Sequence, residues 1–325
     1  MSHSLLLSFI RSRRALSSKG FTLAELLVVI FIAGAIISGL MYLAVELLTT
    51  DNREATRTET QRDLQLAMDF MSSELREAIF VYSDVIDPDT NALFTFFPTN
   101  DPDFGNPVLA FWKQQRLPIE VRERCAVEDL EANPTLRQTC LRGYSYTLVV
   151  YSLGGVAAGN NNDSWRGRAQ IVRSAMNQFD SNDGDVNNGY ISPVTNASVA
   201  FDTWPPAGQT PAFNQTNVLT DFIDDGTSVD RARSGECPEA PGVDPIYGVS
   251  PSQPVNGSIR SFYACVSLPG TTANGTPLSA ASQNQEVIIY LQGNAAGRSG
   301  LFRENSFLPT LETRVLSRGI LDKNF

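Results

Sequence analysis

The stretch Lys19-Gly20-Phe21-Thr22-Leu23-Ala24-Glu25 stands directly before a long apolar run, and the two together decide the fold of the N-terminal part of the chain. The run, residues 26–45, contains twenty uncharged and mostly apolar residues. At about 1.5 Å per residue, such a run can cross the hydrocarbon core of a bilayer as an α-helix. The first twenty residues include no acidic residue and four basic ones, Arg11, Arg13, Arg14 and Lys19. This excess of positive charge predicts a cytoplasmic N-terminus and export of everything after residue 45.

Glu25 is an unusual residue for the start of a membrane helix. A carboxylate in this position costs on the order of 2.5 to 3.5 kcal/mol unless a partner neutralises it. Cleavage of the Gly20–Phe21 bond would create an amine four residues before Glu25. If a neighbouring copy presented that amine, the two groups would form a charge-assisted contact in a medium of low dielectric constant. The sequence therefore predicts self-assembly by staggered packing of like helices.

Two other interpretations of this segment remain open. An ordinary secretory signal peptide would use residues 21–32 as its apolar region and Ala33-Gly34-Ala35 as its cleavage site. An uncut signal anchor would keep the whole helix. Against the signal peptide, Glu25 interrupts the apolar region, and the apolar run continues ten residues beyond Ala35.

Gly20-Phe21-Thr22-Leu23-Ala24-Glu25, with a basic leader before it, resembles the signal of the type IV pilin and type II secretion pseudopilin superfamily. The resemblance covers about the first 60 residues. It implies a pilin-like fold, cleavage after Gly20, N-methylation of Phe21, and use of Glu25 to set the register of the subunit in a filament. The leader of twenty residues is long for the family. The helix also lacks the proline that is common in the middle of the family's helices. Gly34 and Gly39 could weaken the helix there instead, because glycine destabilises a helix interior.

The resemblance also implies partners and a location. The direct partners would be a prepilin peptidase and other pilin-like subunits, and the indirect ones an assembly platform protein and its ATPase. The subunit would cross the inner membrane once, with its N-terminus in the cytoplasm and its C-terminal domain in the periplasm. From there it would enter a pilus or pseudopilus.

The composition limits the remaining functions. The chain has 325 residues and a formal net charge of −10, which becomes −14 when the four basic residues of the leader are removed. Such an acidic product is a poor ligand for nucleic acid or anionic lipid. The length after the N-terminal helix suffices for one sizeable globular domain or two small ones, and a single elaborated exported domain, residues 84–325, is preferred.

Histidine is almost absent from the chain. The single histidine, His3, lies in the expected leader, residues 1–20, so the mature protein would have no histidine-based catalytic or metal site. Phosphate-binding and nucleophile-elbow motifs are also missing from the sequence. We therefore expect no enzymatic activity, no catalytic residues and no cofactor.

Four cysteines follow in the exported part, with no CxxC spacing. An even number of cysteines in an exported domain favours disulfides. Of the three possible connectivities, Cys125–Cys140 and Cys237–Cys265 is favoured because each pair is close in sequence and brackets a turn-rich loop. Each bond would contribute about 3 kcal/mol in the chain-entropy model. Four buried free thiols are the alternative.

The helix is predicted to continue beyond the membrane. Residues 49–63 are polar on all sides. A single apolar stripe with helical spacing then follows: Leu64, Ala67, Met68, Met71, Leu75, Ala78, Ile79 and Tyr82. We therefore expect a membrane half over residues 21–48 and an amphipathic half over residues 49–83. Asp87-Pro88-Asp89 would end the helix.

The part of the sequence after the helix predicts strands and loops. Residues 144–151 are the best strand, and residues 169–173, 259–268, 286–292 and 313–316 are further candidates. Turn-rich stretches separate them, so the expected fold class is α+β, with the long helix packed on an antiparallel sheet that carries large loop insertions.

A loop-rich insertion is expected over about residues 154–258, because Gly, Asn, Asp and Pro are frequent there. The insertion contains seven aromatic residues: Trp165, Phe179, Tyr190, Phe201, Trp204, Phe213 and Phe222. They either anchor the insertion by burial or form an exposed platform for glycan or a partner. Within it, Asp180, Asn182, Asp183 and Asp185 resemble a calcium loop in composition, although the spacing does not match the EF-hand pattern. A solvated turn is the alternative.

These observations predict a non-enzymatic minor pilin or pseudopilin subunit, since a large domain with insertions suits a minor component better than a densely repeated shaft. In scale it is similar to large minor pilins of the PilW type. The stretch Phe307-Leu308-Pro309-Thr310-Leu311-Glu312-Thr313-Arg314 is similar to cyanobacterial pseudopilins associated with hormogonium polysaccharide secretion. The alternative functions are a tip adhesin or glycan-binding module and, less favoured, a membrane-tethered enzyme.

Overall fold

The computed structural model describes residues 20–85, 104–127, 131–132, 134–155, 167–180, 182–193, 199, 201, 204, 213, 215–226, 236–239, 247–252, 261–269, 284–298 and 307–319. His3, the leader before Gly20, the expected helix stop at Asp87-Pro88-Asp89, and Trp165 lie outside these residues. The chain divides into two compact units, Met1–Asn52 and Arg53–Phe325.

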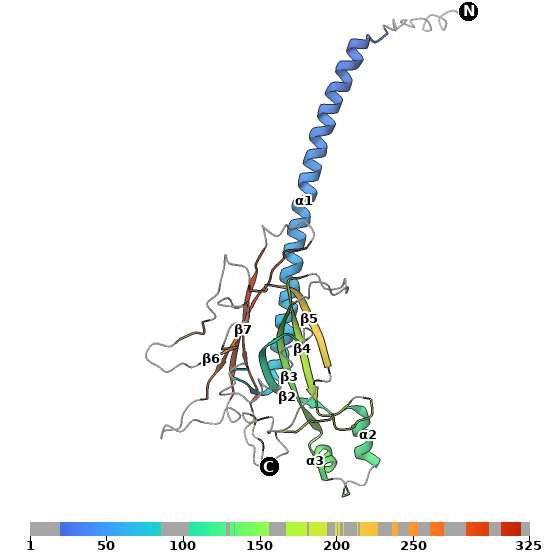
Figure 1. Ribbon diagram of the computed structural model, residues 1–325. Helices are drawn as coiled ribbons and strands as arrows, with labels where there is room; N and C mark the ends of the chain where they lie inside the picture. The colour runs from blue at the N-terminus through green and yellow to red at the C-terminus, as the bar shows by residue number, and fades with distance from the viewer. Residues whose placement is uncertain are drawn as a thin grey trace, which may run out of the picture. The chain divides into compact units, whose positions relative to one another are not determined.

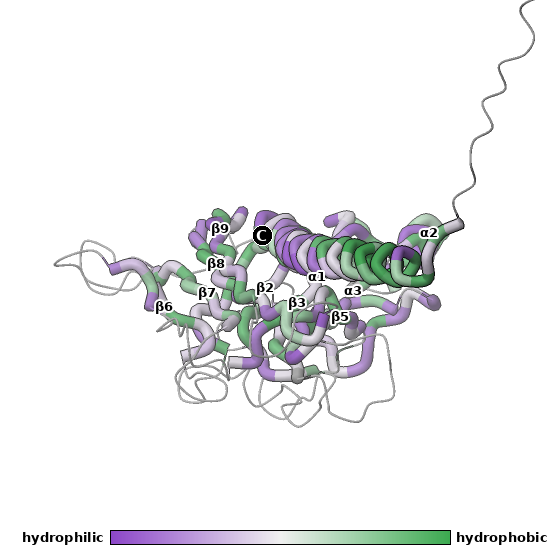
Figure 2. The backbone as a smooth tube through the Cα atoms, turned by 90° about the horizontal axis from the view of Figure 1, so that it is seen from above, coloured by the Kyte–Doolittle hydropathy of each residue, from purple (hydrophilic) through white to green (hydrophobic). Residues whose placement is uncertain are grey.

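The fold is α+β, with one long N-terminal helix and antiparallel sheets (Figure 1). Helix α1 (Leu23–Arg76) has an apolar first part and a polar later part, which Figure 2 shows as a change from green to purple along the tube. From Leu64 onward its apolar stripe is buried in the domain that follows. This is a pilin-like architecture, as the N-terminal resemblance implies.

Helix α1 ends earlier than predicted. It stops at Arg76, and strand β1 (Ala78–Val81) occupies positions assigned to the helix. Ala78 and Val81 enter one hydrophobic core, whereas Ile79 and Phe80 enter another. An extended segment can serve two cores because its side chains leave both faces of the sheet. The continued helical spacing of Ala78, Ile79 and Tyr82 was therefore misleading.

The first sheet has five strands in the order β1-β2-β3-β4-β5, all neighbours being antiparallel. After β1 these are β2 (Asn106–Arg116), β3 (Tyr144–Gly155), β4 (Ala169–Asn177) and β5 (Gln215–Ile223). Helices α2 (Ile119–Val127) and α3 (Pro134–Arg142) connect β2 to β3. β3 and β4 contain the predicted strands 144–151 and 169–173. β2, β5 and both short helices were not predicted.

The second sheet has the order β6-β7-β8-β9 and is also antiparallel. Its strands are β6 (Tyr247–Ser250), β7 (Phe262–Ser267), β8 (Glu286–Gln292) and β9 (Thr310–Leu316). The predicted strands at 259–268, 286–292 and 313–316 correspond to β7, β8 and β9. The sequence predicted a single sheet, whereas the structure divides the strands between two.

One core joins α1 to both sheets. Leu64, Met68, Met71 and Leu75 of α1 belong to the same buried cluster as inward-facing residues of β2 to β5 and of β7 to β9. The sheets also meet at β1, where Gln285 accepts from the Val81 backbone N–H at 2.8 Å and donates to the Val81 carbonyl at 2.8 Å. Both sheets therefore depend on the same helix for their burial.

Candidate functional site

The N-terminal end of α1 is built by a helix cap. The Glu25 backbone N–H donates to Thr22 Oγ1 at 3.2 Å, and the Leu26 N–H donates to the Thr22 carbonyl at 3.2 Å. The Thr22 hydroxyl therefore satisfies the Glu25 N–H, a donor that the helix start leaves without an intrahelical partner, while the Thr22 carbonyl accepts the first intrahelical bond. The cap uses the backbone of Glu25, and within the described residues no hydrogen bond or salt bridge engages the Glu25 carboxylate. The cap therefore does not use the carboxylate of Glu25.

The segment after the cap is apolar on every side. An 18-residue window of α1 has a mean hydropathy of 2.6 and no buried residue. Phe21 is 76% exposed and Leu23 85% exposed, and a Cβ added at Gly34 or Gly39 would meet no atom within 4 Å. A helix with apolar residues on all faces requires lipid or other helices around it. Together with the disulfides, this segment indicates a membrane-anchored chain with an extracytoplasmic domain.

The part of α1 after residue 52 is held by charged contacts at two places. At the first, Arg298 Nη1 lies 2.8 Å from Glu59 Oε2, Arg298 Nη2 donates to Asp63, and the guanidinium lies 4.1 Å from the centre of the Phe222 ring. The Arg298 backbone N–H donates to the Ala295 carbonyl at 3.2 Å. Residues 293–298, which follow β8, therefore bind α1 through Arg298, and we call this segment the strap.

The second place is the last turn of α1, where Glu74 is buried. Arg173 donates to both carboxylate oxygens of Glu74 at 2.8 Å, Lys113 Nζ donates at 2.7 Å, and the Tyr151 hydroxyl also donates. Burial alone would raise the pKa of Glu74, but hydrogen bonds from Arg173, Lys113 and Tyr151 lower it to about 2. Burial and the negative charge of Glu74 raise the pKa of Tyr151 well above its usual value. Glu74 is therefore ionised and Tyr151 neutral near pH 7.

Sequence reasoning missed both of these charged contacts. Glu74 stands beside Leu75 of the apolar stripe, and Arg173 lies in a predicted strand. Charged residues are normal beside the apolar stripe of an amphipathic helix, so the sequence alone does not show that Glu74 is buried and paired. Arg298 gave no signal either, because it lies in a Gly-rich stretch with no regular pattern.

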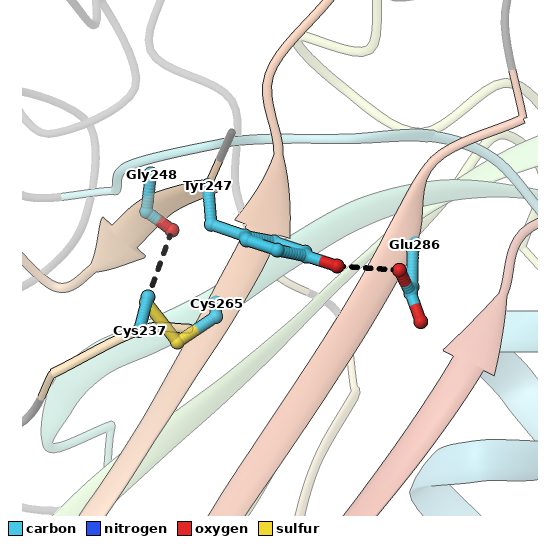
Figure 3. The surroundings of a disulfide bond; sticks show 5 residues. All are labelled: Cys237, Tyr247, Gly248, Cys265 and Glu286. Carbon is cyan, nitrogen blue, oxygen red and sulfur yellow. Dashed lines mark hydrogen bonds between the residues drawn. A yellow bond between two sulfur atoms is a disulfide. The ribbon is translucent and has the colours of Figure 1, made fainter. Parts of the chain in front are cut away.

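The structure pairs Cys125 with Cys140 and Cys237 with Cys265, the connectivity that the sequence favoured over four free thiols. The first bond links α2 to α3 beside the small core of Leu117, Val121, Leu136 and Phe179. The second bond, in Figure 3, ties a short segment to β7 next to β6, and Tyr247 there points to Glu286 on β8. The first bond therefore fixes two helices to each other, and the second fixes a peripheral segment on a sheet.

Four of the seven aromatic residues of the insertion, Tyr190, Phe201, Trp204 and Phe213, contribute to a second core on the outer face of the first sheet. Trp204 and Phe201 are 1% and 2% exposed, and both pack against Trp112 of β2. Trp204 Nε1 donates to the Ile191 carbonyl at 2.6 Å, and the Tyr190 hydroxyl donates to the Tyr146 carbonyl at 2.7 Å. Burial anchors these aromatics, so they do not form an exposed platform.

The calcium candidate is a tight turn stabilised by its own side chains. Asp180 Oδ1 accepts from the Asn182 backbone at 2.8 Å, and Asp183 Oδ1 accepts from the Asp185 backbone at 2.9 Å. The Asp185 carboxylate lies 2.8 Å from Arg124 Nη1. Among the described residues, no group of three or more His, Cys, Asp or Glu side chains could hold a metal ion. The geometry of the turn favours the solvated-turn interpretation.

Comparison of the chain with protein-family models, with curated proteins and with solved structures finds no match.

Proposed function

We propose that this chain is a non-enzymatic minor pilin or pseudopilin subunit of a type IV pilus or a type II-like secretion pseudopilus. The single observation that carries the proposal is the start of α1, where an exposed apolar helix carries Glu25 with its carboxylate not engaged by the described residues. Such a group within lipid requires a cationic partner. The amine of Phe21 on a neighbouring subunit, created by cleavage after Gly20 and then N-methylated, would supply it.

The proposal includes the location and partners that the signal implies. The subunit would be cut by prepilin peptidase, with its N-terminus in the cytoplasm and its domain in the periplasm. It would then be extracted by the assembly platform and ATPase together with other pilin-like subunits. Secretion of polysaccharide or motility would be the cellular output. Two of the aromatic residues on which the adhesin alternative was based, Phe201 and Trp204, are buried.

The test uses the full-length chain in native membranes. Glu25→Ala should abolish copurification with other pilin-like subunits, because the amine of the neighbour then has no acceptor. Glu46→Ala is the matched control, since Glu46 is also an exposed acidic residue of α1 but follows the apolar run. Copurification that survives Glu25→Ala unchanged would refute the assembly role.

Intact mass spectrometry tests the processing step separately. The mature chain should begin at Phe21 and carry one additional methyl group. A product that retains residues 1–20 in cells with an active prepilin peptidase would contradict the proposal.

A further inference from the structure

Strand β9 leaves one edge of the second sheet free. It is the last strand of that sheet, so only its other edge pairs with a neighbour, β8 (Figure 2). The Gly293 N–H donates to the Pro309 carbonyl and the Ser317 N–H to the Gln285 carbonyl, both at 2.8 Å. Because the hydrogen-bonding direction alternates along an antiparallel strand, the odd-numbered residues of β9 face β8 and the even-numbered ones direct their backbone groups to the free edge. These free-edge residues, all exposed, are Thr310, Glu312, Arg314 and Leu316, and within the described part of the chain no hydrogen bond engages their backbone groups.

The other terminal strands of the two sheets are protected in ways that β9 is not. β1 and β6 have four residues each, and on β1 both backbone groups of Val81 are bound by Gln285. β5 pairs with β4 through two register shifts, and its Phe222 has a φ of 59°, outside the range of an extended strand. Short strands and bulges are the usual protection of a sheet edge against pairing with another chain. β9 has seven residues in unbroken register with β8 and contains neither proline nor lysine, so it is the terminal strand best suited to accept a further strand.

The side chains of β9 leave apolar surface beside the free edge. Leu311 packs against the core around α1 but is only partly buried, and Thr313 on the same face is also half-buried. On the opposite face, Leu316 is 59% exposed. Glu312 and Arg314 lie 3.6 Å from each other, so their charges are paired within the chain and select no ligand. The complementary ligand is therefore an extended backbone with apolar side chains beside Leu311 and Leu316.

The direction of β9 argues against a second copy of this chain as the ligand. Before β9 begins, the Arg57 guanidinium lies 5.4 Å from the centre of the Phe307 ring, and after β9 ends, the Arg318 N–H donates to the Ala78 carbonyl at 3.0 Å. β9 therefore runs along α1 in the same direction as the helix. Antiparallel pairing of two β9 strands would point the two α1 helices in opposite directions, so both could not be anchored in one membrane with the same orientation. Parallel pairing would require adjacent copies, which a minor subunit does not provide.

We propose that the free edge of β9 binds an extended segment of a different pilin-like subunit, which adds a fifth strand to the second sheet. The backbone groups of the free-edge residues would bind the backbone of that segment, and Leu311 and Leu316 would contact its side chains on the two faces of the sheet. The inference rests on the proposed function, because a minor subunit has other subunits as its neighbours. It adds the surface through which the exported domain joins one of them.

Hydrogen exchange at single-residue resolution tests the contact in the full-length protein. In the subunit purified alone in detergent, the amides of the free-edge residues should exchange rapidly, whereas those of Leu311, Thr313 and Val315, which face β8, should exchange slowly. In complexes copurified with other pilin-like subunits, exchange of the free-edge amides should slow about tenfold or more, while the other three amides stay unchanged. Free-edge amides that exchange equally fast in the complexes would overturn the inference.

A proline variant gives a second measurement. Glu312→Pro removes one N–H of the free edge and leaves the pairing with β8 intact, so it should fold and yet lower copurification about fivefold or more. Glu312→Ala is the matched control, because it removes the same charge but keeps the N–H, and it should copurify like the parent chain. Equal yields from the two variants would refute the contact, and the exchange measurement on the parent chain decides if the proline variant does not fold.

Photo-crosslinking identifies the ligand. Benzoylphenylalanine at Leu316, in native membranes, should capture a peptide from a pilin-like subunit other than this chain. Capture of a second copy, capture of a protein of another class, or no capture would overturn the inference. If copurification still depends on Glu25 while the free-edge amides stay unprotected, only this inference fails and the proposed function stands. A parent chain that never copurifies with pilin-like subunits would overturn both.

Discussion

Replacement of Glu74 by glutamine should be the most informative single change in the exported domain. The substitution keeps the shape of the side chain but removes the charge that Arg173 and Lys113 neutralise. Their side chains are only 15% and 14% exposed, so two cations would remain largely buried with a neutral partner. Truncation of one member of a buried ion pair typically costs about 3 to 5 kcal/mol.

The depressed pKa gives an independent magnitude for the same contact. The pKa of Glu74 falls from 4.5 to about 2 in the folded chain. At 1.36 kcal/mol per pKa unit, this difference corresponds to about 3 kcal/mol of unfolding free energy. Because the folded pKa is the lower one, the contribution is complete above pH 4.5 and is lost as the pH falls toward 2.

The assay is denaturant unfolding of the full-length protein in detergent micelles with the disulfides intact, followed by near-ultraviolet circular dichroism. At pH 7, Glu74→Gln should lower the free energy of unfolding by about 3 kcal/mol relative to the parent chain. Between pH 4.5 and pH 2 the parent should lose stability that the variant no longer has, so the two curves should converge.

Glu77→Gln is the matched control, because Glu77 lies 3.4 Å from the same Lys113 but its side chain is 62% exposed. An exposed pair contributes less than about 1 kcal/mol, so this variant should remain close to the parent at every pH. Equal losses in the Glu74 and Glu77 variants, or curves for the Glu74 variant that run parallel to the parent below pH 4.5, would refute the reasoning.

Three further changes test the packing elsewhere, each measured by the same unfolding assay. A Cβ at Gly293 would lie 2.5 Å from Leu64 Cδ1, so Gly293→Ala should displace the strap and cost about 1 to 3 kcal/mol; a neutral result would contradict the close approach. Cys237→Ser together with Cys265→Ser opens a loop of 28 residues and should cost about 3 to 4 kcal/mol, whereas an unchanged midpoint would show that the bond contributes nothing. Trp204→Ala should cost about 3 to 5 kcal/mol, and a loss below 1 kcal/mol would argue against its burial in the second core.

The sequence predicted those parts of the fold whose apolar residues form a local pattern typical of a helix or a strand. The apolar run gave the membrane half of α1, and the stripe from Leu64 to Leu75 gave its buried face. β3 was found because Tyr144 begins a run rich in aromatic and β-branched residues. Each of these signals is local, so no tertiary contact was needed to recognise it.

The parts that were missed depend on contacts between distant segments. β2 contains the continuous apolar run Val108 to Trp112, because Phe111 faces the core of α1 while Trp112 faces the aromatic core on the other side. A strand buried on both faces lacks the alternation that identifies a strand in an antiparallel sheet. β5 was missed because it lies within residues 154–258, which are rich in Gly, Asn, Asp and Pro, and its own first three residues are polar.

The residues of the candidate site also fall into two groups, those that local sequence identified and those that only the fold brings together. Glu25 could be recognised because an isolated carboxylate at the start of an apolar run is a local feature, whereas the cap at Thr22 was found only in the structure. The partners of Glu74 are 39 to 99 residues away along the chain, and Arg298 is 235 residues from Asp63. Only the folded chain brings such groups together, so their roles could not be derived from spacing.

The buried charge also explains how α1 can have a single register on the sheet. The apolar stripe is nearly periodic, so a slide of one turn, about 5.4 Å, would place Met68 where Leu64 packs and Leu75 where Met71 packs. Hydrophobic burial alone would distinguish these registers weakly, because leucine and methionine have similar volumes. The same slide would move Glu74 away from Arg173 and Lys113, and a slide in the opposite direction would bring Phe70 to them, whose side chain cannot accept a hydrogen bond. Leaving the two cations unpaired would cost several kcal/mol, so Glu74 selects one register where apolar packing would tolerate more than one.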